Sequence, residues 1–440
     1  MRRVRMRAII QAGGKGSRLR SITKDKIPKP MVSILGKPLL QWQIEFLSSS
    51  GIDEIFLIIG YLGDVIKEYF KDGKRFGVSI TYIKEKQPLG TAGGLYYLKE
   101  YVQKHETLLF LYGDIFFDID LSRMEKFHLD KKSILTAFLH PNGHPFDSDI
   151  IEVDEKQKII NLLPKGEKRN KWYGNLVNAA LYMIQSDVIQ RLDKVQRLDF
   201  ERDILLEMIK KSAPVFGYHS TEYVKDVGTE ERLYSIEKDI RSGLIEKRNL
   251  RNRQKCIFLD RDGTLTKASG LIDSEEKLEV MACAVNAIRN INASEYLAIL
   301  VTNQPVVARG MCTLADVKCI HKKLETLLGE KGAYLDDIIF CPHHPDKGFP
   351  EENPMYKVKC KCRKPETGMM EEMKNRYNIS LEESWIVGDT TIDIMTGKNA
   401  GVRTALVLTG ESGKDGKYNV LPDIIGQDVE CAVRQIIGAG

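Results

Sequence analysis

Short apolar runs alternate with helix-like stretches along this chain, and the alternation begins twice. Such a pattern is typical of strands buried in a parallel sheet, because helices then cover both faces of the sheet. The expected strands are residues 8–10, 55–59, 80–83 and 108–112 in the first series and 256–259, 297–301, 337–340, 385–387 and 403–407 in the second. We therefore expect two α/β domains.

The boundary between the two series falls near residue 250. Just before it, Leu233, Ile236, Ile240 and Leu244 recur at the spacing of one helical face, and Thr229 is placed to cap that helix. The expected division is a first domain at residues 1–248, a linker at 249–254 and a second domain at 255–440.

Composition excludes several classes of protein. The chain is 42% hydrophobic and 29% charged, which is typical of a globular protein with a buried core. No apolar run approaches the roughly 20 residues of a membrane helix and no secretion signal is evident, so we expect a cytoplasmic protein without a membrane partner. The net charge of +5 is small and forms no basic stripe, which argues against a nucleic-acid partner. A homo-oligomer is compatible with these features.

The first candidate site begins with a Gly-rich segment, QAGGKGSRLR, at residues 11–20. Gly13 and Gly14 would let backbone N–H groups approach phosphate oxygens closely, while Arg18 and Lys29 could neutralise a triphosphate. A tight turn alone would explain the glycines equally well. The Pro-Lys-Pro sequence around Lys29 favours the phosphate site.

Two carboxylates occur where a metal site would need them. Asp114 ends an apolar strand, and Asp226 precedes the sequence Val-Gly-Thr. Hard oxygen ligands at strand ends suit Mg²⁺ that is bound together with substrate phosphates. Taken singly, each residue is more often part of a loop or a helix cap.

Several ordered motifs resemble the sugar-phosphate nucleotidyltransferase family. They are GGxGxRL, PKPM, LGTAGG at residues 89–94, Gly-Asp at 113–114 and KDVGT at 225–229, within residues 6–245. The resemblance implies a Rossmann-like, GT-A-like domain that binds a nucleoside triphosphate and Mg²⁺. A sugar 1-phosphate oxygen would attack the α-phosphorus and pyrophosphate would leave. Arg18 and Lys29 would then stabilise the phosphates, and Asp114 and Asp226 would hold the metal.

The same resemblance implies further binding residues. Gly90 and Thr91 match part of the loop that binds the base, and Lys165 matches the lysine that contacts the sugar phosphate. Gly174 and Asn178 match the segment that hydrogen-bonds sugar hydroxyls. The sequence departs from the family pattern at two positions: Pro164 stands where an acidic residue is common, and Gln11 replaces Leu or Val.

A second motif, DRDGT, follows the strand expected at residues 256–259. Asp260 can attack phosphorus and Asp262 can protonate the leaving oxygen. This motif and those that follow resemble the haloacid-dehalogenase-like phosphatases over residues 254–435. The resemblance implies phosphate binding by Thr302 and Lys364, and Mg²⁺ held by Asp260, Asp262 and Asp389 with Asp393 nearby.

A separate signal is the pair of short ligand motifs CPHH and CKC. Cys341, His343, Cys360 and Cys362 could close a tetrahedral zinc site, which would be structural and would position Arg363 and Lys364. Buried cysteines and a surface histidine pair would be the alternative. The zinc loop resembles the heptose-bisphosphate and histidinol-phosphate phosphatase branch, which implies that Asn303, Arg309 and Arg363 lie near the substrate.

The fusion of these two families favours consecutive steps in nucleotide-sugar biosynthesis. The phosphatase would remove the 7-phosphate of a heptose 1,7-bisphosphate, and the transferase would convert the 1-phosphate and a nucleoside triphosphate, with GTP preferred, to a nucleotide sugar. Two alternatives stay open: a histidinol-phosphate phosphatase joined to an unrelated hexose-1-phosphate guanylyltransferase, and a sugar-nucleotide sensor without turnover.

Overall fold

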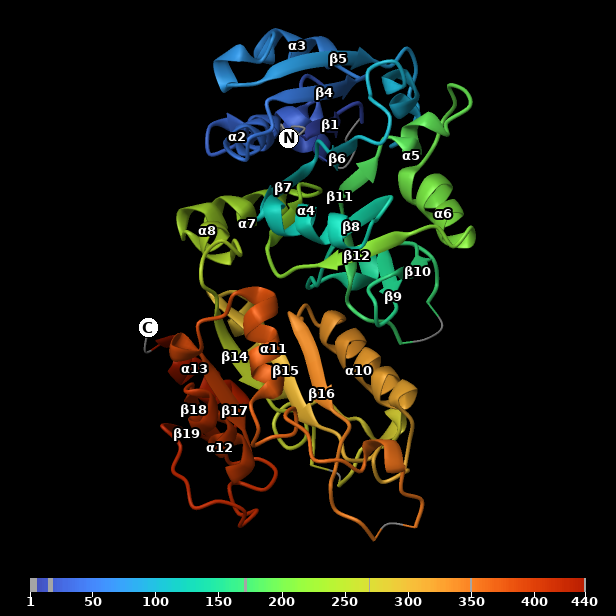
Figure 1. The fold of residues 1–440 in the computed structure, drawn as a ribbon. Coiled ribbons are helices and arrows are strands. Elements are labelled where there is room, and N and C mark those ends of the chain that lie inside the picture. The colour runs from blue at the N-terminus through green and yellow to red at the C-terminus, as the bar shows by residue number, and fades with distance from the viewer. Residues whose placement is uncertain (1–5, 15–18, 170–171, 269, 349, 439–440) are drawn as a thin grey trace. The chain divides into compact units, whose positions relative to one another are not determined.

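The computed structural model describes residues 6–14, 19–169, 172–268, 270–348 and 350–438 (Figure 1). The chain divides into two compact units. The first comprises residues 1–140, 151–163 and 178–249, and the second comprises residues 141–150, 164–177 and 250–440. Each unit contains its own sheet, which confirms the expected two-domain α/β fold class.

The first unit is built on a nine-stranded mixed sheet in which β1 lies between β4 and β6. The path of strands is β10-β9-β11-β6-β1-β4-β5, and β8 joins β11 to β12. Strands β4, β1 and β6 run parallel, whereas β11 is antiparallel to β6. The strands are β1 (Arg7–Gln11), β4 (Glu54–Ile59), β5 (Ser79–Lys84), β6 (Thr107–Tyr112), β8 (Leu135–His140), β9 (Ile150–Val153), β10 (Ile159–Leu163), β11 (Val177–Gln185) and β12 (Val215–His219).

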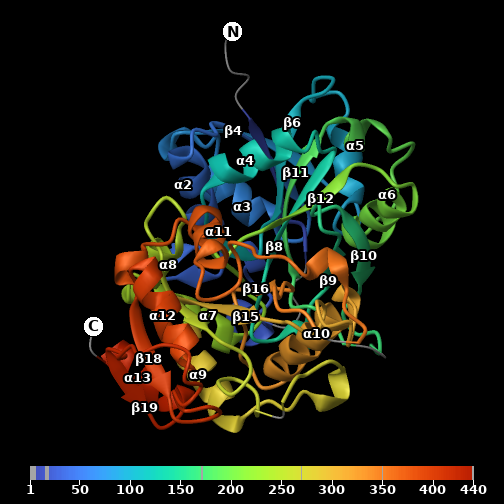
Figure 2. The same ribbon diagram turned by 60° about the horizontal axis from the view of Figure 1, so that its bottom comes forward.

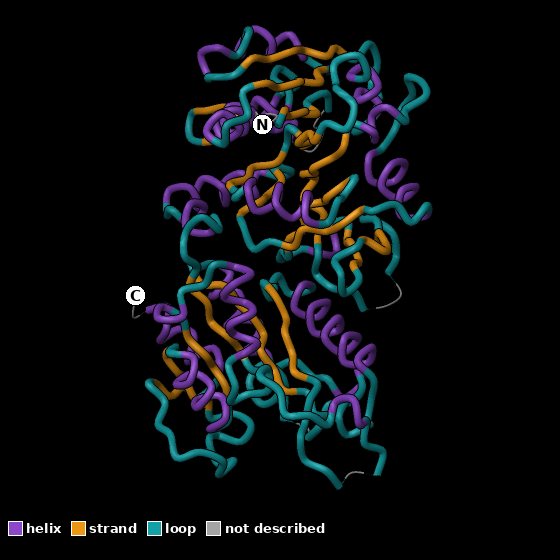
Figure 3. The backbone as a smooth tube through the Cα atoms, viewed as in Figure 1, coloured by secondary structure: helices purple, strands orange, loops and turns teal. Residues whose placement is uncertain are grey.

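Three amphipathic helices cover one face of this sheet (Figure 3). They are α2 (Leu39–Ser49), α3 (Gly63–Phe70) and α4 (Leu121–Asp130). Their apolar side chains pack on Ile10, Leu57 and Leu111, which point to the same face because side chains alternate along a strand. The shorter elements of the unit are α1 (Arg20–Thr23), η2 (Lys29–Met31), β2 (Ser33–Ile34), β3 (Lys37–Pro38), η3 (Lys74–Phe76), η4 (Gly93–Leu98), α5 (Asp187–Gln190), η6 (Phe200–Leu205) and α6 (Leu206–Lys210). The short helix η5 (Pro145–Asp147) lies in residues 141–150, which group with the second unit.

A two-stranded ribbon brings distant parts of the first unit together. Strand β7 (Ile115–Asp118) pairs antiparallel with β13 (Tyr223–Asp226). Thr229 then caps α7 (Glu230–Arg241) by accepting a hydrogen bond from the N–H of Arg232, as predicted. The predicted continuation of that helical face to Leu244 is wrong in one respect: Gly243, with φ +71°, separates α7 from α8 (Leu244–Arg248).

The second unit contains a six-stranded parallel sheet in the order β16-β15-β14-β17-β18-β19. Five of its strands confirm the predicted series, and the short edge strand β19 was not predicted. The strands are β14 (Lys255–Leu259), β15 (Tyr296–Asn303), β16 (Asp337–Cys341), β17 (Trp385–Gly388), β18 (Arg403–Val407) and β19 (Ile424–Gly426).

Helices cover both faces of this parallel sheet (Figure 2). One face packs against α9 (Ala282–Asn292), α10 (Leu314–Gly329) and α13 (Val429–Gly438). The other packs against α11 (Gly368–Tyr377), and α12 (Thr391–Ala400) approaches it through Gly397, whose Cβ position would lie 2.6 Å from Ile386. The remaining turns are η7 (Glu275–Lys277), η8 (Pro354–Tyr356) and η9 (Leu381–Glu383). Among the described residues, no helix is long and apolar enough to span a membrane.

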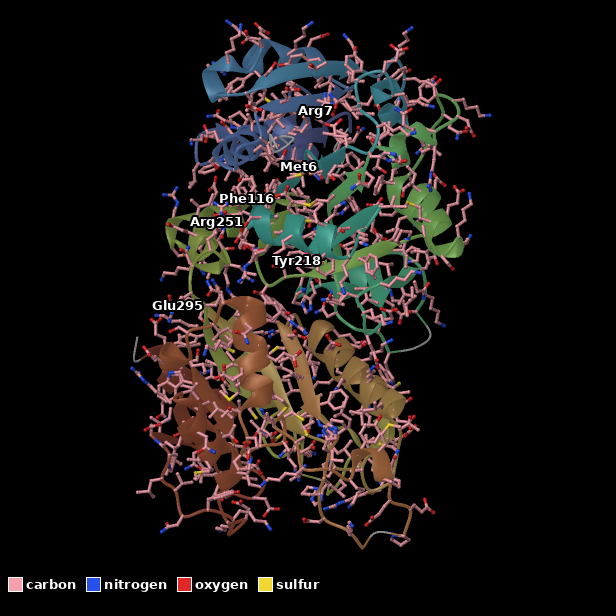
Figure 4. The ribbon with its side chains drawn as sticks, viewed as in Figure 1. Met6, Arg7, Phe116, Tyr218, Arg251 and Glu295 are labelled. Atoms are coloured by element: carbon pink, nitrogen blue, oxygen red, sulfur yellow. The ribbon has the colours of Figure 1, made fainter. Side chains whose placement is uncertain are left out.

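Ion pairs fix the amino ends of the central strands. Arg7, at the start of β1, contacts Glu106 at 2.6 Å, and Lys255, at the start of β14, contacts Glu295 at 2.8 Å. Figure 4 labels Arg7 and Glu295 on their respective units. The carboxyl ends of the same strands remain available for polar groups, which is where parallel sheets bind ligands.

Candidate active sites

Lys29, Asp114 and Asp226 come together at one edge of the first unit. The N–H of Val227 donates to the Asp114 carbonyl at 2.8 Å, so the β7–β13 ribbon places the backbones of Asp114 and Asp226 side by side. Lys29 Nζ lies 2.6 Å from Asp114, and Arg232 Nη1 donates to both oxygens of Asp226 at 2.6 and 2.5 Å. The pair of carboxylates suits a divalent cation that also contacts phosphates. Arg18, the other predicted catalytic cation, lies outside the described residues.

The glycines of the two predicted nucleotide loops meet different constraints. A Cβ at Gly13 would lie 2.8 Å from Oε2 of Glu85, whereas Gly14 has open space around it. Gly90 has φ +80°, and a Cβ there would lie 2.3 Å from the carbonyl oxygen of Leu198. Gly90 is therefore required both by close approach to backbone and by its own backbone conformation, whereas a side chain at Gly13 would have to displace the end of the Glu85 side chain.

Glu85 is a buried carboxylate that sequence reasoning did not single out. Its Oε1 has no hydrogen-bond partner among the described residues, and burial raises its pKa despite hydrogen bonds from Gln11 and the Leu89 backbone. Gln11, the departure from the family pattern, also donates to the Gly90 carbonyl at 3.2 Å. The end of β1 is thus connected both to Glu85 and to the second glycine loop.

A second buried carboxylate, Glu201, lies beside the predicted sugar-binding residue Asn178. Tyr112 donates to its two oxygens at 2.9 and 2.8 Å, Tyr182 donates at 2.6 Å and Asn178 at 3.2 Å. These donors favour the ionised carboxylate, but burial outweighs them and raises the pKa of Glu201 to about 7. The predicted residue Thr91 accepts a hydrogen bond from the Phe200 N–H at 2.8 Å, next to this network.

Lys165 and Gly174 lie in residues 164–177, a segment that groups with the second unit. The N–H of Lys165 donates to Asp149 at 2.8 Å, and its ammonium group lies 3.7 Å from the same carboxylate. The side chain of Lys165 is 56% exposed and is therefore accessible to a ligand.

In the second unit, strand ends and one helix bring three carboxylates together. Asp260 follows β14, Asp389 follows β17 and Asp393 lies in the first turn of α12. One oxygen from each lies within 4.8 Å of the others. Lys364 bridges two of them, with its Nζ 2.6 Å from Asp260 and 2.5 Å from Asp393.

The charge of this cluster fits a divalent cation. Three buried carboxylates surround one ammonium group, and Asp389 Oδ1 has no hydrogen-bond partner within the described part of the chain. Burial raises the pKa of Asp260 to about 6 and that of Asp389 to about 8, with repulsion between the carboxylates adding to the effect. A bound cation would remove both penalties. Gly263 leaves room for Asp389, since a Cβ there would lie 2.3 Å from its Oδ2.

Asp262, predicted as a catalytic residue and metal ligand, lies outside this carboxylate cluster. Its carboxylate accepts two hydrogen bonds from Arg261 at 2.8 Å, one from Gln304 at 3.1 Å and one from Thr266 at 3.2 Å. Gln304 also donates to Thr302, the predicted phosphate-binding residue, at 2.9 Å. The predicted general acid and the predicted phosphate-binding hydroxyl are therefore held by one amide group.

The other predicted substrate residues form a cationic group next to this site. Asn303 exchanges two hydrogen bonds, of 3.1 and 3.0 Å, with the backbone of Lys364, so its amide positions that lysine. Burial lowers the pKa of Arg363, and the positive charge of Arg309 lowers it further. Together they are suited to bind an anionic substrate.

Cys341, His343, Cys360 and Cys362 converge, with one ligand atom from each within 4.8 Å of the others. The three sulfur–sulfur distances are 3.1, 3.2 and 3.5 Å, and the set of donors could hold a tetrahedral metal ion. Arg363 is attached to this cluster at two points. Its N–H lies 3.4 Å from Cys360 Sγ, and its Nη1 donates to the His343 carbonyl at 3.1 Å.

Sequence reasoning missed the residues that act through hydrogen bonds in the interior. Glu201 lies in a single turn of π-helix, an element that is frequent at functional sites but has no sequence signature. Gln304 directly follows the predicted substrate residues Thr302 and Asn303, but it was not itself predicted. The signal available in the sequence was a polar residue close to a motif or within an apolar stretch.

Comparisons with known proteins agree with this geometry. A family described as nucleotidyl transferase matches residues 7–243, and a HAD-hydrolase-like family matches residues 361–432. The first half is similar to a D-glycero-alpha-D-manno-heptose 1-phosphate guanylyltransferase of Campylobacter jejuni, with 38% identity over 233 residues, which cover 52% of this chain and 97% of that protein.

The second half is similar to phosphatases from two other bacteria. Both are named D-glycero-beta-D-manno-heptose-1,7-bisphosphate 7-phosphatase. The protein of Rhodopseudomonas palustris is 35% identical over 150 residues, covering 34% of this chain and 81% of the relative. The protein of Pasteurella multocida is 36% identical over 177 residues, which cover 39% of this chain and 93% of that relative.

The raised pKa of Glu201 predicts a pH-dependent stability. The unfolded side chain titrates near about 4.3, whereas the folded one titrates at about 7, so the folded protein retains a proton between these values. The stabilisation is complete below the unfolded pKa and declines as the pH rises toward the folded pKa. We expect Glu201→Gln to remove a decline of about 3 kcal/mol in unfolding free energy between pH 4.5 and 7.

Urea denaturation at a series of pH values measures this dependence. Glu207→Gln is the matched control, because Glu207 is exposed on α6. An unchanged pH dependence in Glu201→Gln would show that another group causes it.

Proposed function

Because this chain belongs to the nucleotidyl transferase family and its second half is homologous to heptose-bisphosphate phosphatases, we propose that it catalyses two consecutive steps of nucleotide-sugar biosynthesis. The phosphatase removes the 7-phosphate of D-glycero-D-manno-heptose 1,7-bisphosphate. The transferase then joins the heptose 1-phosphate to a nucleotide and releases pyrophosphate. The observation that carries the proposal is the presence in one chain of both carboxylate sites, each at the strand ends of its own sheet.

We assign the two activities to residues 1–248 and 255–440, joined by residues 249–254. In the second domain Asp260 is the nucleophile, Asp262 is the acid and base, and Lys364 stabilises the charge of the phosphoryl group together with Thr302. Bound Mg²⁺ would neutralise the Asp260, Asp389 and Asp393 carboxylates and the transferred phosphoryl group.

In the first domain no covalent intermediate is required. Lys29 contacts Asp114 and is positioned to neutralise phosphate charge, and Gly13 and Gly14 present backbone N–H groups to the triphosphate. Bound Mg²⁺, held by Asp114 and Asp226, would neutralise the departing pyrophosphate. Asn178 binds the sugar phosphate, whereas the role of Lys165, which groups with the second unit, stays a prediction. Catalysis here consists of alignment and charge neutralisation.

We propose GTP as the preferred nucleotide because of Glu85. An ionised carboxylate only accepts hydrogen bonds, and guanine offers two adjacent donors, N1–H and the N2 amino group, on one edge. Uracil and thymine offer a single N–H there. Glu85 lies beside Gly13 and is connected through Gln11 to the Gly90 loop, between the expected phosphate and base positions.

The names of the relatives also restrict the anomer. The guanylyltransferase relative is named for the alpha 1-phosphate, whereas the phosphatase relatives are named for the beta 1,7-bisphosphate. Dephosphorylation at position 7 leaves the anomeric centre unchanged, so consecutive steps require one anomer. We propose that the second domain accepts the alpha bisphosphate.

The metal of the Cys341, His343, Cys360 and Cys362 cluster is proposed to be zinc with a structural role. Three thiolates and one imidazole close a tetrahedral site without an open position. The two attachments of Arg363 to this cluster support a role in positioning that guanidinium.

Incubation with each anomer of the bisphosphate, Mg²⁺ and each common nucleoside triphosphate tests the coupled reaction. We expect phosphate release and an NDP-heptose from one anomer. Asp260→Asn should lower both products by at least about 10³-fold, since the nucleophile is lost. Asp114→Ala should lower only the nucleotide sugar, and supplying heptose 1-phosphate should bypass the Asp260→Asn block. If neither anomer loses phosphate, the heptose assignment is wrong.

Glu85→Gln tests the base preference. The amide presents a donor where guanine also presents donors, so we expect kcat/KM for GTP to fall roughly 10- to 100-fold, with a smaller fall or a gain for UTP. Lys84→Gln, on the exposed neighbouring residue, is the control. Equal losses with GTP and UTP would assign Glu85 a purely structural role.

Cys360→Ser tests the metal proposal. We expect zinc, measured by elemental mass spectrometry, to fall from one ion per chain toward none, and phosphatase activity to fall while pyrophosphate release by the transferase persists. Cys431→Ser, outside the cluster, should change neither. A different resident metal, or full activity in the metal-free variant, would contradict the structural zinc assignment.

A further inference from the structure

Arg261 stands between the two aspartates of the DRDGT motif, and its side chain is completely buried. Residues at such a position in a loop usually point to solvent, and a buried guanidinium must have partners for its hydrogen-bond donors. The four described contacts of Arg261 use four of the five N–H donors of a guanidinium group.

The contacts lie on two sides of the guanidinium group. Nε and Nη2 donate to Oδ1 and Oδ2 of Asp262, both at 2.8 Å, so the planar fork of Arg261 matches the planar carboxylate. The opposite side of the guanidinium is anchored. Nη2 donates to Gln304 Oε1 at 2.8 Å, and Nη1 lies 3.2 Å from Nε2 of His321 on α10.

Two residues, His321 and Gln304, anchor Arg261. His321 is buried, packs on the ring of Phe340, and burial together with Arg261 holds its pKa well below the usual value. It is therefore neutral and can accept the Arg261 hydrogen bond through Nε2. Gln304 connects the same guanidinium to Asp262 and Thr302. A core helix and a strand end thus jointly fix the orientation of one carboxylate.

We propose that Arg261 is a positioning residue for Asp262, anchored by His321 and Gln304, and that this anchor sets the efficiency of both proton transfers in the phosphatase. This inference rests on the proposed phosphatase function. The Asp262 side chain is 30% exposed, whereas that of Arg261 is completely buried, so a substrate can reach the carboxylate but not the guanidinium.

Each step of the reaction requires the oriented carboxyl group. In the first, Asp260 attacks phosphorus, the bond from phosphorus to the sugar oxygen breaks, and Asp262 gives its proton to that oxygen. In the second, a water oxygen attacks the aspartyl-phosphate, Asp262 takes the water proton, and the bond between phosphorus and Asp260 breaks. Misorientation of Asp262 slows both transfers but leaves the nucleophile in place.

Arg261→Lys retains a positive charge but cannot form the two parallel hydrogen bonds. For the heptose bisphosphate we expect kcat to fall about 10- to 100-fold with little change in KM, because proton transfer contributes factors of this order. An activated aryl phosphate, 4-nitrophenyl phosphate, needs no proton for its leaving group. With it we expect a rapid burst of nitrophenolate at nearly the wild-type rate, followed by slow turnover as the aspartyl-phosphate accumulates.

A second pair of variants tests the anchor if Arg261→Lys is unstable. His321→Gln keeps a hydrogen-bond acceptor and should retain kcat within about 3-fold, whereas His321→Leu should lower it about 10-fold with the burst preserved. A burst rate that falls as much as the turnover of the bisphosphate, or an unchanged kcat in all three variants, would overturn the inference. Absence of phosphatase activity in the wild-type protein would instead overturn the proposed function.

Discussion

Both units of this chain depend on a central strand whose parallel neighbours end at the same edge of the sheet. β1 lies between β4 and β6, and β14 lies between β15 and β17. Polar side chains that follow such strands lie close together even when they are far apart in sequence, because parallel pairing aligns the carboxyl ends of the strands. Asp260 and Asp389 follow adjacent strands β14 and β17, and for this reason residues 129 positions apart in sequence converge.

Burial of a carboxylate raises the free energy of its ionised form, and the two units offset this cost with different partners. In the second unit the ammonium group of Lys364 lies against Asp260 and Asp393, and its own pKa is raised because their attraction outweighs burial. In the first unit Glu201 has no cation among its described hydrogen-bond partners and relies on Tyr112, Tyr182 and Asn178. Lys364 favours the ionised form of Asp260, although burial still raises the pKa of Asp260 to about 6. Glu201 has only neutral donors among its described partners, and its pKa is raised to about 7.

Motifs in the sequence were sufficient to predict the fold class and the groups that carry charge at strand ends. Asp260, Lys364 and the cysteine cluster could be placed because their chemistry and their spacing agree. Arg261, Gln304 and Glu201 could not, because their importance comes from partners far away in the chain, such as His321. The break at Gly243 was also missed, since apolar spacing continues through it while the backbone does not.

The segment that carries Cys360, Cys362 and Arg363 differs in kind from the strand ends. It contains the guanidinium that we propose for recognition and two of the cysteines that could hold a metal ion beside it, whereas Asp260 and Asp389 follow strands of the sheet. The nucleophile and the guanidinium proposed for recognition therefore come from separate stretches of sequence, although Lys364 directly follows Arg363. During evolution, substitutions or insertions in this segment that spare Lys364 can change which phosphate ester is accepted while Asp260 and Asp389 stay in place, so one ancestral scaffold can give rise to phosphatases of different specificity.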